Sequence, residues 1–319
     1  MKKILCVLMS CLLFEMAGCS GHSKNLKFGA ADIGGVYYSF ASTFTQLADK
    51  EIDGYTFETK TTAGSVANLR LISDGYIDLA IVQADLLSDA YNATGTFADK
   101  KYQKGYKAVA SLYTECCQIV VRKDSGITGI DDLINKTVSV GASESGSEKN
   151  AEQILKMSGI TDELINKVNM DYTEAAEKLK AGEIDAFFCT AGTRTEVIGQ
   201  LSKECDICLI SLDDKCIDKM LSAYSLCEKY TIPAGTYNGQ DSDVTTIGVK
   251  AVLIAKQSLS DDVIKNVTKT IYEHADDFKY ATSLDISFDI NTAADGVDIP
   301  FHSGAAAYYT ERGINVLTE

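Results

Sequence analysis

The hydrophobic and polar positions of this chain follow the same order twice. The first copy predicts a strand, a Gly-rich turn, a helix, a strand, a helix and a buried strand, at residues 26–31, 32–35, 37–51, 55–61, 65–73 and 79–82. The second copy predicts the same series at residues 136–141, 142–147, 148–159, 167–172, 173–182 and 184–189. Both copies place Gly-x-Ile-Asp before the last strand, as GYID (75–78) and GEID (182–185). Since βαβ crossovers produce parallel strands covered by helices, the pattern predicts two α/β lobes.

The remaining patterned segments predict how the chain connects these lobes. Residues 107–123 and 245–256 are strand-like, and helices are expected over 261–278 and within 302–313. The simplest connection returns the chain to the first lobe, so we expect crossovers near 114–117 and 242–248 that act as a hinge. Lobe I is then expected at 26–115 and 246–319, and lobe II at 116–245. Each lobe should hold a mostly parallel sheet flanked by helices.

The N-terminus predicts export. Residues 4–14 are apolar but too short to span a bilayer, and they follow two lysines. The small residues before Cys19 resemble a bacterial lipobox, so residues 1–19 are interpreted as a lipoprotein signal peptide with Cys19 lipidated. An ordinary signal peptide cut nearby is the alternative. Residues 20–25 are expected to be a polar tether, which gives an exported protein anchored by lipid at the periplasmic face or cell surface.

Composition and charge exclude several function classes. The net charge of −15 argues against nucleic acid as a partner, because phosphates require a basic surface. Cys205 and Cys208 form a C-x2-C without a second tight pair, so no zinc site is expected, and the thiols are interpreted as structural or as one or two disulfides. No Ser-His-Asp order, dinucleotide fingerprint or P-loop is found. We therefore expect neither a cofactor, nor a metal, nor enzymatic activity.

The turns after the predicted strands carry the candidate ligand-binding residues. In open parallel sheets, ligands bind beyond the carboxyl ends of the strands, where helix N-termini present free N–H groups to anions. Gly permits close approach of the backbone, and Ser and Tyr add hydroxyl groups. The predicted binding residues are Gly34, Gly35, Tyr37, Gly64, Ser65, Asn68, Gln83, Ser143, Ser145, Gly146, Ser147 and Arg194. Plain helix capping by each Ser and a surface position for Arg194 remain the alternatives.

Several segments, in order along the chain, resemble one family. They are GGVYY (34–38), TTAGSVANLRLISDGYIDLAIVQAD (61–85), VVRKDSGI (120–127), VSVGASESGS (138–147), GEIDAFFCTAG (182–192), TIPAGTYNGQ (231–240) and TIGVKAVLIA (246–255). The chain resembles the TAXI group of solute receptors, the extracytoplasmic binding proteins of TRAP transporters. The resemblance implies a type II-like periplasmic-binding-protein fold whose lobes close on a ligand. It also implies a monomeric receptor that delivers glutamate, glutamine or a related small carboxylate to an ion-driven permease.

The resemblance supports some of the candidate residues and departs from the family at others. It implies pocket positions for Gly35, Tyr37, Ser65, Asn68 and Gln83, and for the loop 143–147. The family's second loop reads more like GAPGSGT, whereas this chain has GASESGS, a difference that affects the ligand. Two alternatives to a transport receptor remain: a ligand-sensing or adhesive surface lipoprotein without a permease, and an enzyme on the same scaffold.

Overall fold

The computed structural model of the chain describes residues 23–99, 102, 105–283 and 288–319. The predicted signal peptide and Cys19 lie outside the described residues, as does the first part of the predicted tether. The first strand begins at Lys24, inside the predicted tether.

The strands form one sheet of ten strands that runs through both lobes. They are β1 (Lys24–Gly29), β2 (Tyr55–Lys60), β3 (Leu79–Gln83), β4 (Tyr106–Arg122), β5 (Thr137–Ser139), β6 (Asn166–Val168), β7 (Ala186–Ala191), β8 (Ile207–Leu209), β9 (Cys227–Ile232) and β10 (Val244–Lys256). The order is β2-β1-β3-β10-β4-β7-β5-β6, with β8 paired to β4 and β9 paired to β10. Strands β1, β2 and β3 are parallel, and so are β5, β6 and β7.

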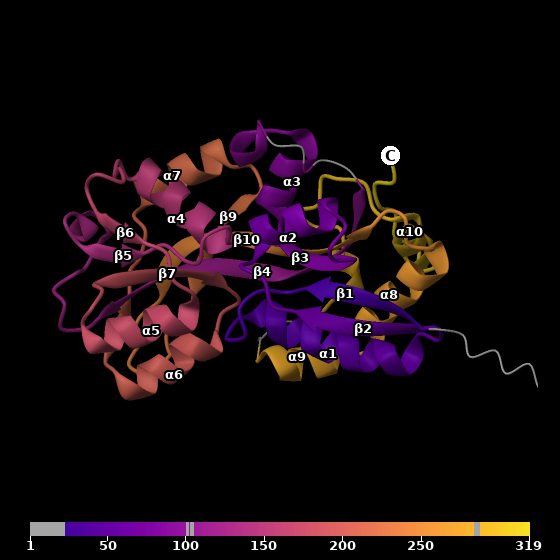
Figure 1. Cartoon of the computed structure of the whole chain (residues 1–319). Coiled ribbons are helices and arrows are strands. Elements are labelled where there is room, and N and C mark those ends of the chain that lie inside the picture. Colours follow the sequence, from indigo (N-terminus) through magenta and orange to yellow (C-terminus); the bar gives the residue numbers. More distant parts are fainter. Residues whose placement is uncertain (1–22, 100–101, 103–104, 284–287) are drawn as a thin grey trace, which may run out of the picture.

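Two long antiparallel strands join the lobes, β4 and β10 (Figure 1). Strand β4 pairs with β10 up to Cys116 and with β7 from Cys116 onward. The crossovers expected near 114–117 and 242–248 therefore lie inside continuous strands. The two-lobe α/β fold is confirmed, but its sheets are not separate, because β4 and β10 extend through both.

The helices cover the sheet in two groups, which define the lobes in Figure 1. They are α1 (Val36–Glu51), α2 (Ser65–Ser73), α3 (Ala84–Asn92), α4 (Gly146–Met157), α5 (Tyr172–Ala181), α6 (Glu196–Glu204), α7 (Asp214–Ala223), α8 (Asp261–Glu273), α9 (Ala275–Thr282) and α10 (Ser303–Thr310). Lobe I holds α1–α3 and α8–α10, and lobe II holds α4–α7. The single helix predicted over 261–278 is two helices, because His274 leaves the helical conformation (φ −116°, ψ 30°).

Two large buried apolar clusters form the core, and the larger one extends from lobe I to side chains of α5 and α6 in lobe II. In lobe I, the rings of Phe40 and Phe278 stack with their centroids 4.4 Å apart, and Phe288 packs against both. This cluster attaches α9 to α1. In lobe II, branched aliphatic side chains from β4, β5 and α4 form a second buried cluster. Apolar packing therefore holds each lobe together and also joins lobe I to lobe II.

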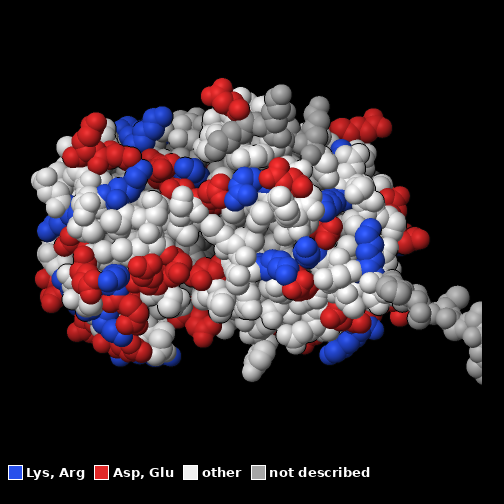
Figure 2. Space-filling model, viewed as in Figure 1, with Lys and Arg blue, Asp and Glu red and all other residues white. Residues whose placement is uncertain are grey.

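The structure also bears on the membrane and on the thiols. None of the helices within the described residues is long and apolar enough to cross a bilayer. All cysteines from Cys116 to Cys227 are free thiols. The structure therefore agrees with the interpretation of structural thiols and not with that of one or two disulfides. Figure 2 shows acidic and basic side chains interspersed over the visible face, without a broad basic patch.

We expect Phe278→Ala to destabilise lobe I by about 3–5 kcal/mol, because the fully buried ring would leave a cavity against Phe40. Tyr280→Ala on the same helix is the control, since that ring is 89% exposed and should change stability by less than about 0.5 kcal/mol. Urea unfolding of both variants measures the difference. Equal losses would show that α9 is not held by the aromatic stack.

Candidate ligand-binding site

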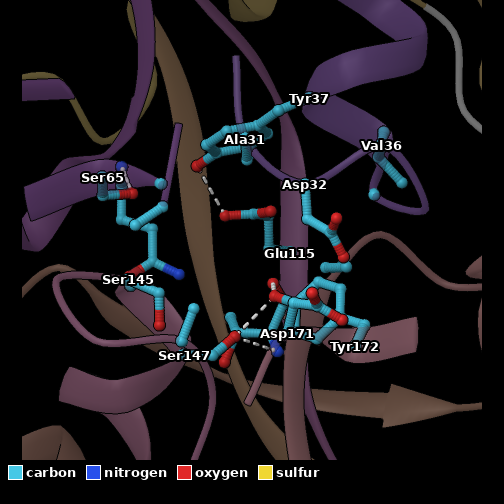
Figure 3. A pocket seen from close by; sticks show the side chains of 18 residues that line it. Ala31, Asp32, Val36, Tyr37, Ser65, Glu115, Ser145, Ser147, Asp171 and Tyr172 are labelled. Carbon is cyan, nitrogen blue, oxygen red and sulfur yellow. Dashed lines mark hydrogen bonds between the residues drawn. The ribbon is translucent and has the colours of Figure 1, made fainter. Parts of the chain in front are cut away.

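A cavity lies between the lobes, at the carboxyl ends of the parallel strands (Figure 3). The empty space within it is about 470 Å³, including the part that opens to solvent. Lobe I and the adjoining part of β4 contribute Ala31, Asp32, Gly35, Val36, Tyr37, Ala63, Gly64, Ser65, Gln83 and Glu115 to its lining. Lobe II contributes Ala142, Ser145, Gly146, Ser147, Asp171, Tyr172, Thr190 and Ala191.

Two helices of lobe I begin at this cavity without a side-chain cap. The N-cap residues are Gly35 for α1 and Gly64 for α2, and neither helix has a side-chain hydrogen bond at its N-cap. Gly64 has a φ of 120°, a conformation that a residue with a Cβ rarely adopts. Free N–H groups and the helix dipole make such ends suited to a carboxylate or another anion.

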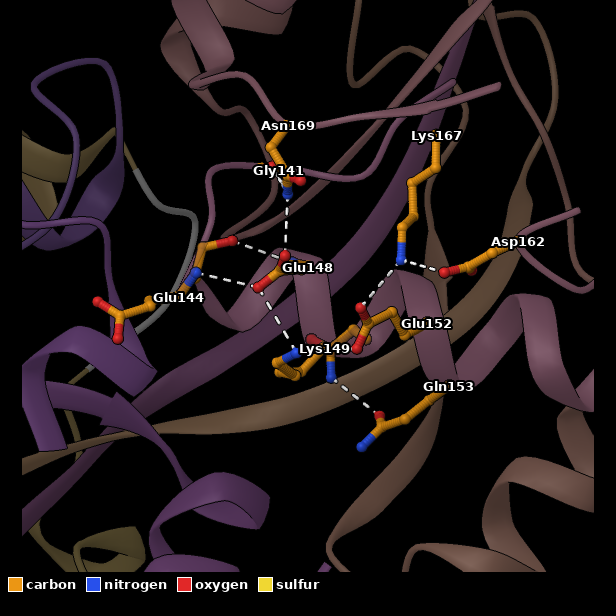
Figure 4. A network of polar contacts seen from close by, with 11 residues as sticks. Gly141, Glu144, Glu148, Lys149, Glu152, Gln153, Asp162, Lys167 and Asn169 are labelled. Atoms are coloured by element: carbon orange, nitrogen blue, oxygen red, sulfur yellow. Dashed lines mark hydrogen bonds and ion pairs between the residues drawn. The ribbon is translucent and has the colours of Figure 1, made fainter. Parts of the chain in front are cut away.

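The loop of lobe II is held rigidly by a polar network (Figure 4). The Ser145 hydroxyl accepts a hydrogen bond from the Glu148 N–H at 3.0 Å and caps α4. The Glu148 carboxylate in turn accepts from the Glu144 N–H at 3.0 Å and from the Asn169 amide at 2.9 Å, and Lys149 lies 3.6 Å from it. These contacts fix the backbone that lines the cavity before a ligand arrives.

Three carboxylates face the same cavity: Asp32, Glu115 and Asp171 (Figure 3). Tyr37 donates a hydrogen bond to Glu115 Oε2 at 2.8 Å. Burial raises the pKa of Glu115 to about 8, although hydrogen bonds from Tyr37 and Gln83 act in the opposite direction. Burial also raises the pKa of Asp32, and the negative charge of Asp171 raises it further. No Lys or Arg is found among the lining residues.

The lobes are in contact around the cavity. Arg70 of α2 forms a two-pronged ion pair with Glu144 of lobe II, at 2.6 and 3.1 Å, and the Ala67 N–H donates to the Glu144 carbonyl at 3.1 Å. A Cβ on Gly146 would lie 2.4 Å from the Gln83 side chain. The described state is therefore closed, and Arg70 bridges the lobes.

The cavity brings together most of the predicted residues. Those that line it are Gly35, Tyr37, Gly64, Ser65, Gln83, Ser145, Gly146 and Ser147. Four predicted residues do not line it: Gly34, Asn68, Ser143 and Arg194. Gly34 packs against Val197 and Thr173 of lobe II, and Ser143 and Arg194 are exposed. The geometry gives the Arg194 side chain no place in the cavity, so its proposed carboxylate clamp is not supported.

The polar groups of Asn68 and Ser147 are used within the protein. The fully buried Asn68 amide donates to the carbonyls of Ala30 and Ile81 at 2.7 and 2.8 Å, which ties β1 to β3. The Ser147 hydroxyl lies 2.6 Å from Tyr172 Oη and accepts from the Thr190 N–H at 2.8 Å. Asn68 therefore supports the site from behind, and Ser147 positions Tyr172.

Sequence reasoning missed five polar lining residues: Asp32, Glu115, Asp171, Tyr172 and Thr190. A signal existed for Glu115, because it is the acidic residue in the otherwise apolar middle of a long predicted strand. Asp32 opens the Gly-rich turn and carried a weaker signal. Asp171 and Tyr172 stand at the start of α5, and Thr190 lies near the end of β7. Only the packing of α5 against β7 directs these three residues to the cavity.

Several solved structures share this two-lobe fold. PhnD1 from Prochlorococcus marinus, in complex with methylphosphonate, is 12% identical with a TM-score of 0.57, over 83% of this chain and 93% of that one. A putative L-cystine ABC transporter from Listeria monocytogenes is 14% identical with a TM-score of 0.52, over 82% and 94%. An ancestral arginine-binding protein bound to arginine is 15% identical with a TM-score of 0.51, over 82% and 98%. At these identities the likeness shows the fold alone.

The family is shown by sequence. The model of the NMT1-like family matches residues 28–313, most of the chain, and the chain belongs to this family.

We expect Asn68→Ala to lower the free energy of unfolding by at least about 2 kcal/mol, because two buried carbonyls lose their donor. Asn92→Ala is the control, since Asn92 is exposed at the end of α3 and should change stability by less than about 0.5 kcal/mol. Chemical denaturation measures both. A variant as stable as the parent would remove Asn68 from its supporting role.

We expect Arg70→Ala to shift the protein toward the open state, because it removes the ion pair between the lobes. The pair is about one-third exposed, so the closed population should fall only a few-fold, in keeping with about 1 kcal/mol or less. Small-angle scattering should then give a larger radius of gyration. The charge swap of Arg70→Glu with Glu144→Arg should restore the parent value, whereas Lys60→Ala, which breaks a pair within lobe I, should leave it unchanged.

Proposed function

We propose that this protein is the extracytoplasmic receptor of a membrane solute transporter. It captures a small amino acid or carboxylate, with glutamate and glutamine the leading choices, by closure of the two lobes. The observation that carries the proposal is the cavity between the lobes. On one side of it lie the uncapped N-termini of α1 and α2 of lobe I, and on the other side lies the rigid Ser145–Ser147 loop of lobe II.

A TRAP-type permease is the proposed recipient of the ligand. The segments from GGVYY to TIGVKAVLIA support this choice through their resemblance to TAXI receptors. We further propose a monomer, tethered to the membrane through Cys19, with lobe I at 26–115 and 246–319 and lobe II at 116–245. Anchoring would keep the receptor close to its permease.

The site favours binding over catalysis. The Tyr172 hydroxyl has one proton, which it donates to the Thr190 carbonyl at 2.9 Å. In the 2.6 Å contact between Tyr172 and Ser147, the Ser147 hydroxyl is therefore the donor, and its proton is engaged in a structural hydrogen bond. Within the described part of the chain no histidine lines the cavity, and Ser147 has no base beside it to make it a nucleophile. The solved relatives given above are binding proteins or belong to transporters.

A thermal-shift screen of the ligand-stripped protein tests the proposal. The panel holds the common amino acids, dicarboxylates, 2-oxoacids, a sulfonate and a phosphonate. At a ligand concentration about 100 times Kd, binding stabilises the folded state by about 2.7 kcal/mol, so Tm should rise by several degrees. L-glutamate or L-glutamine is the expected hit. A panel without any hit would contradict the receptor assignment.

Gly146→Ala should weaken ligand binding at least tenfold and leave the ligand-free Tm nearly unchanged. The three atoms nearest the new Cβ all belong to Gln83 of lobe I, so the collision arises when the lobes close. Gly199→Ala is the matched control, because that helical glycine has no neighbour within 4 Å of the added Cβ. Equal affinities of the two variants would mean that binding does not require this closure.

A further inference from the structure

The cavity has an unbalanced set of charges. Asp32, Glu115 and Asp171 line it, and no Lys or Arg is among its lining residues. A cavity built for a ligand that carries only negative charge would be expected to place a cation beside it. The helix N-termini offer N–H groups to one anionic group, but they give the three carboxylates no partner of opposite charge.

The cavity also holds hydrogen-bond acceptors without a donor. Gln83 is 1% exposed, and its Oε1 has no hydrogen-bond partner. Hydrogen bonding from the same side chain lowers the pKa of Glu115, which indicates that the amide nitrogen faces that carboxyl group and leaves the oxygen for a ligand. Asp32 Oδ2 is likewise buried without a partner. Because an unpaired buried acceptor is costly, these atoms indicate a ligand group that donates several hydrogen bonds.

Glu115 lies at the centre of these acceptors (Figure 3). It is 3% exposed and accepts a hydrogen bond from Tyr37. The titratable groups that face it come from α1, α3, α5, β4 and β7, and are Tyr37, Asp85, Tyr113, Cys116, Tyr172 and Cys189. None of these is a cation, so the carboxyl group has no internal counter-charge.

We propose that the cavity selects solutes that carry a cationic group, an ammonium in particular, and that Glu115 and Gln83 Oε1 are the groups that recognise it. The inference rests on the proposed receptor function and narrows its ligand class. An ammonium donates three hydrogen bonds and brings the missing positive charge. The carboxylate of the same amino acid would be bound at the uncapped starts of α1 and α2.

Binding of such a group is coupled to a proton. Burial raises the pKa of Glu115 to about 8 in the closed state, so without a ligand this carboxyl group is mostly protonated at pH 7 in that state. A neighbouring ammonium stabilises the ionised form, so Glu115 loses its proton to solvent as the ligand binds, while the ammonium keeps its own. Affinity therefore rises with pH, by up to about tenfold per pH unit below 8, and levels off above it.

Isothermal calorimetry with matched ligand pairs tests the proposal. The pairs are L-glutamate with glutarate and L-glutamine with glutaramate, which differ in the ammonium group, and L-arginine and L-lysine complete the set. We expect each amino acid that binds to do so at least tenfold more tightly than its partner without the ammonium. At pH 7, titrations in buffers of different ionisation enthalpy should show release of about one proton per ligand.

Glu115→Gln should keep the fold, because Gln has nearly the same shape. It should weaken amino-acid binding at least tenfold at pH 8 and abolish both the proton release and the pH dependence. Asp218→Asn is the control, since that carboxylate is exposed on α7 and should change none of the three. If Glu115→Gln does not fold, the matched ligand pairs on the parent protein still decide.

The outcomes separate the two proposals. If no ligand binds at any pH, the receptor function itself fails. If glutarate or glutaramate binds as tightly as its amino-acid partner, or if Glu115→Gln binds the amino acid as tightly as the parent protein does, the receptor function stands and the recognition of a cation by Glu115 is overturned.

Discussion

The antiparallel pairing of β4 with β10 is the constraint on which the rest of this structure depends. It joins two sets of parallel strands into one sheet, and it places the carboxyl ends of both sets on either side of the same cavity. Since ligands of open α/β sheets bind beyond those ends, the pairing decides where a site can form. Glu115 lies on β4, next to Cys116, where the pairing of β4 with β10 ends and its pairing with β7 begins.

The cavity combines two kinds of groups, which favour ligands of opposite charge. Uncapped helix N-termini attract negative charge, whereas Asp32, Glu115 and Asp171 attract positive charge. A small zwitterion satisfies both, because its carboxylate and its ammonium are only a few bonds apart. Closure matters for the same reason: the groups come from both lobes, and Arg70 with Glu144 holds the lobes together outside the cavity. The exposed position of that pair makes it a weak contact, which suits a receptor that must release its ligand again.

Several polar side chains support the site through contacts within the protein. Asn68 bonds to the Ala30 and Ile81 carbonyls from behind the surface of the cavity, and Ser147, which lines the cavity, uses its hydroxyl to fix Tyr172. Glu148 fixes the loop from lobe II through contacts with Glu144 and Asn169. A site held in this way is organised before the ligand arrives, so less free energy is lost in ordering it on binding.

The sequence by itself determined the repeated order of strands and helices, the two-lobe α/β fold, and the turns at Gly35, Gly64 and Gly146, because periodicity and glycine act over a few residues. It failed where a contact joins distant segments. The break at His274, the continuity of the sheet, and the roles of Asn68 and Arg70 all depend on partners far along the chain. Tertiary structure alone decided that Tyr37, Gln83 and Glu115 meet, since that requires the pairing of β3 and β4 with β10 and the docking of α1. Burial then changed the chemistry of Glu115, and burial is a property of the folded chain that no local pattern contains.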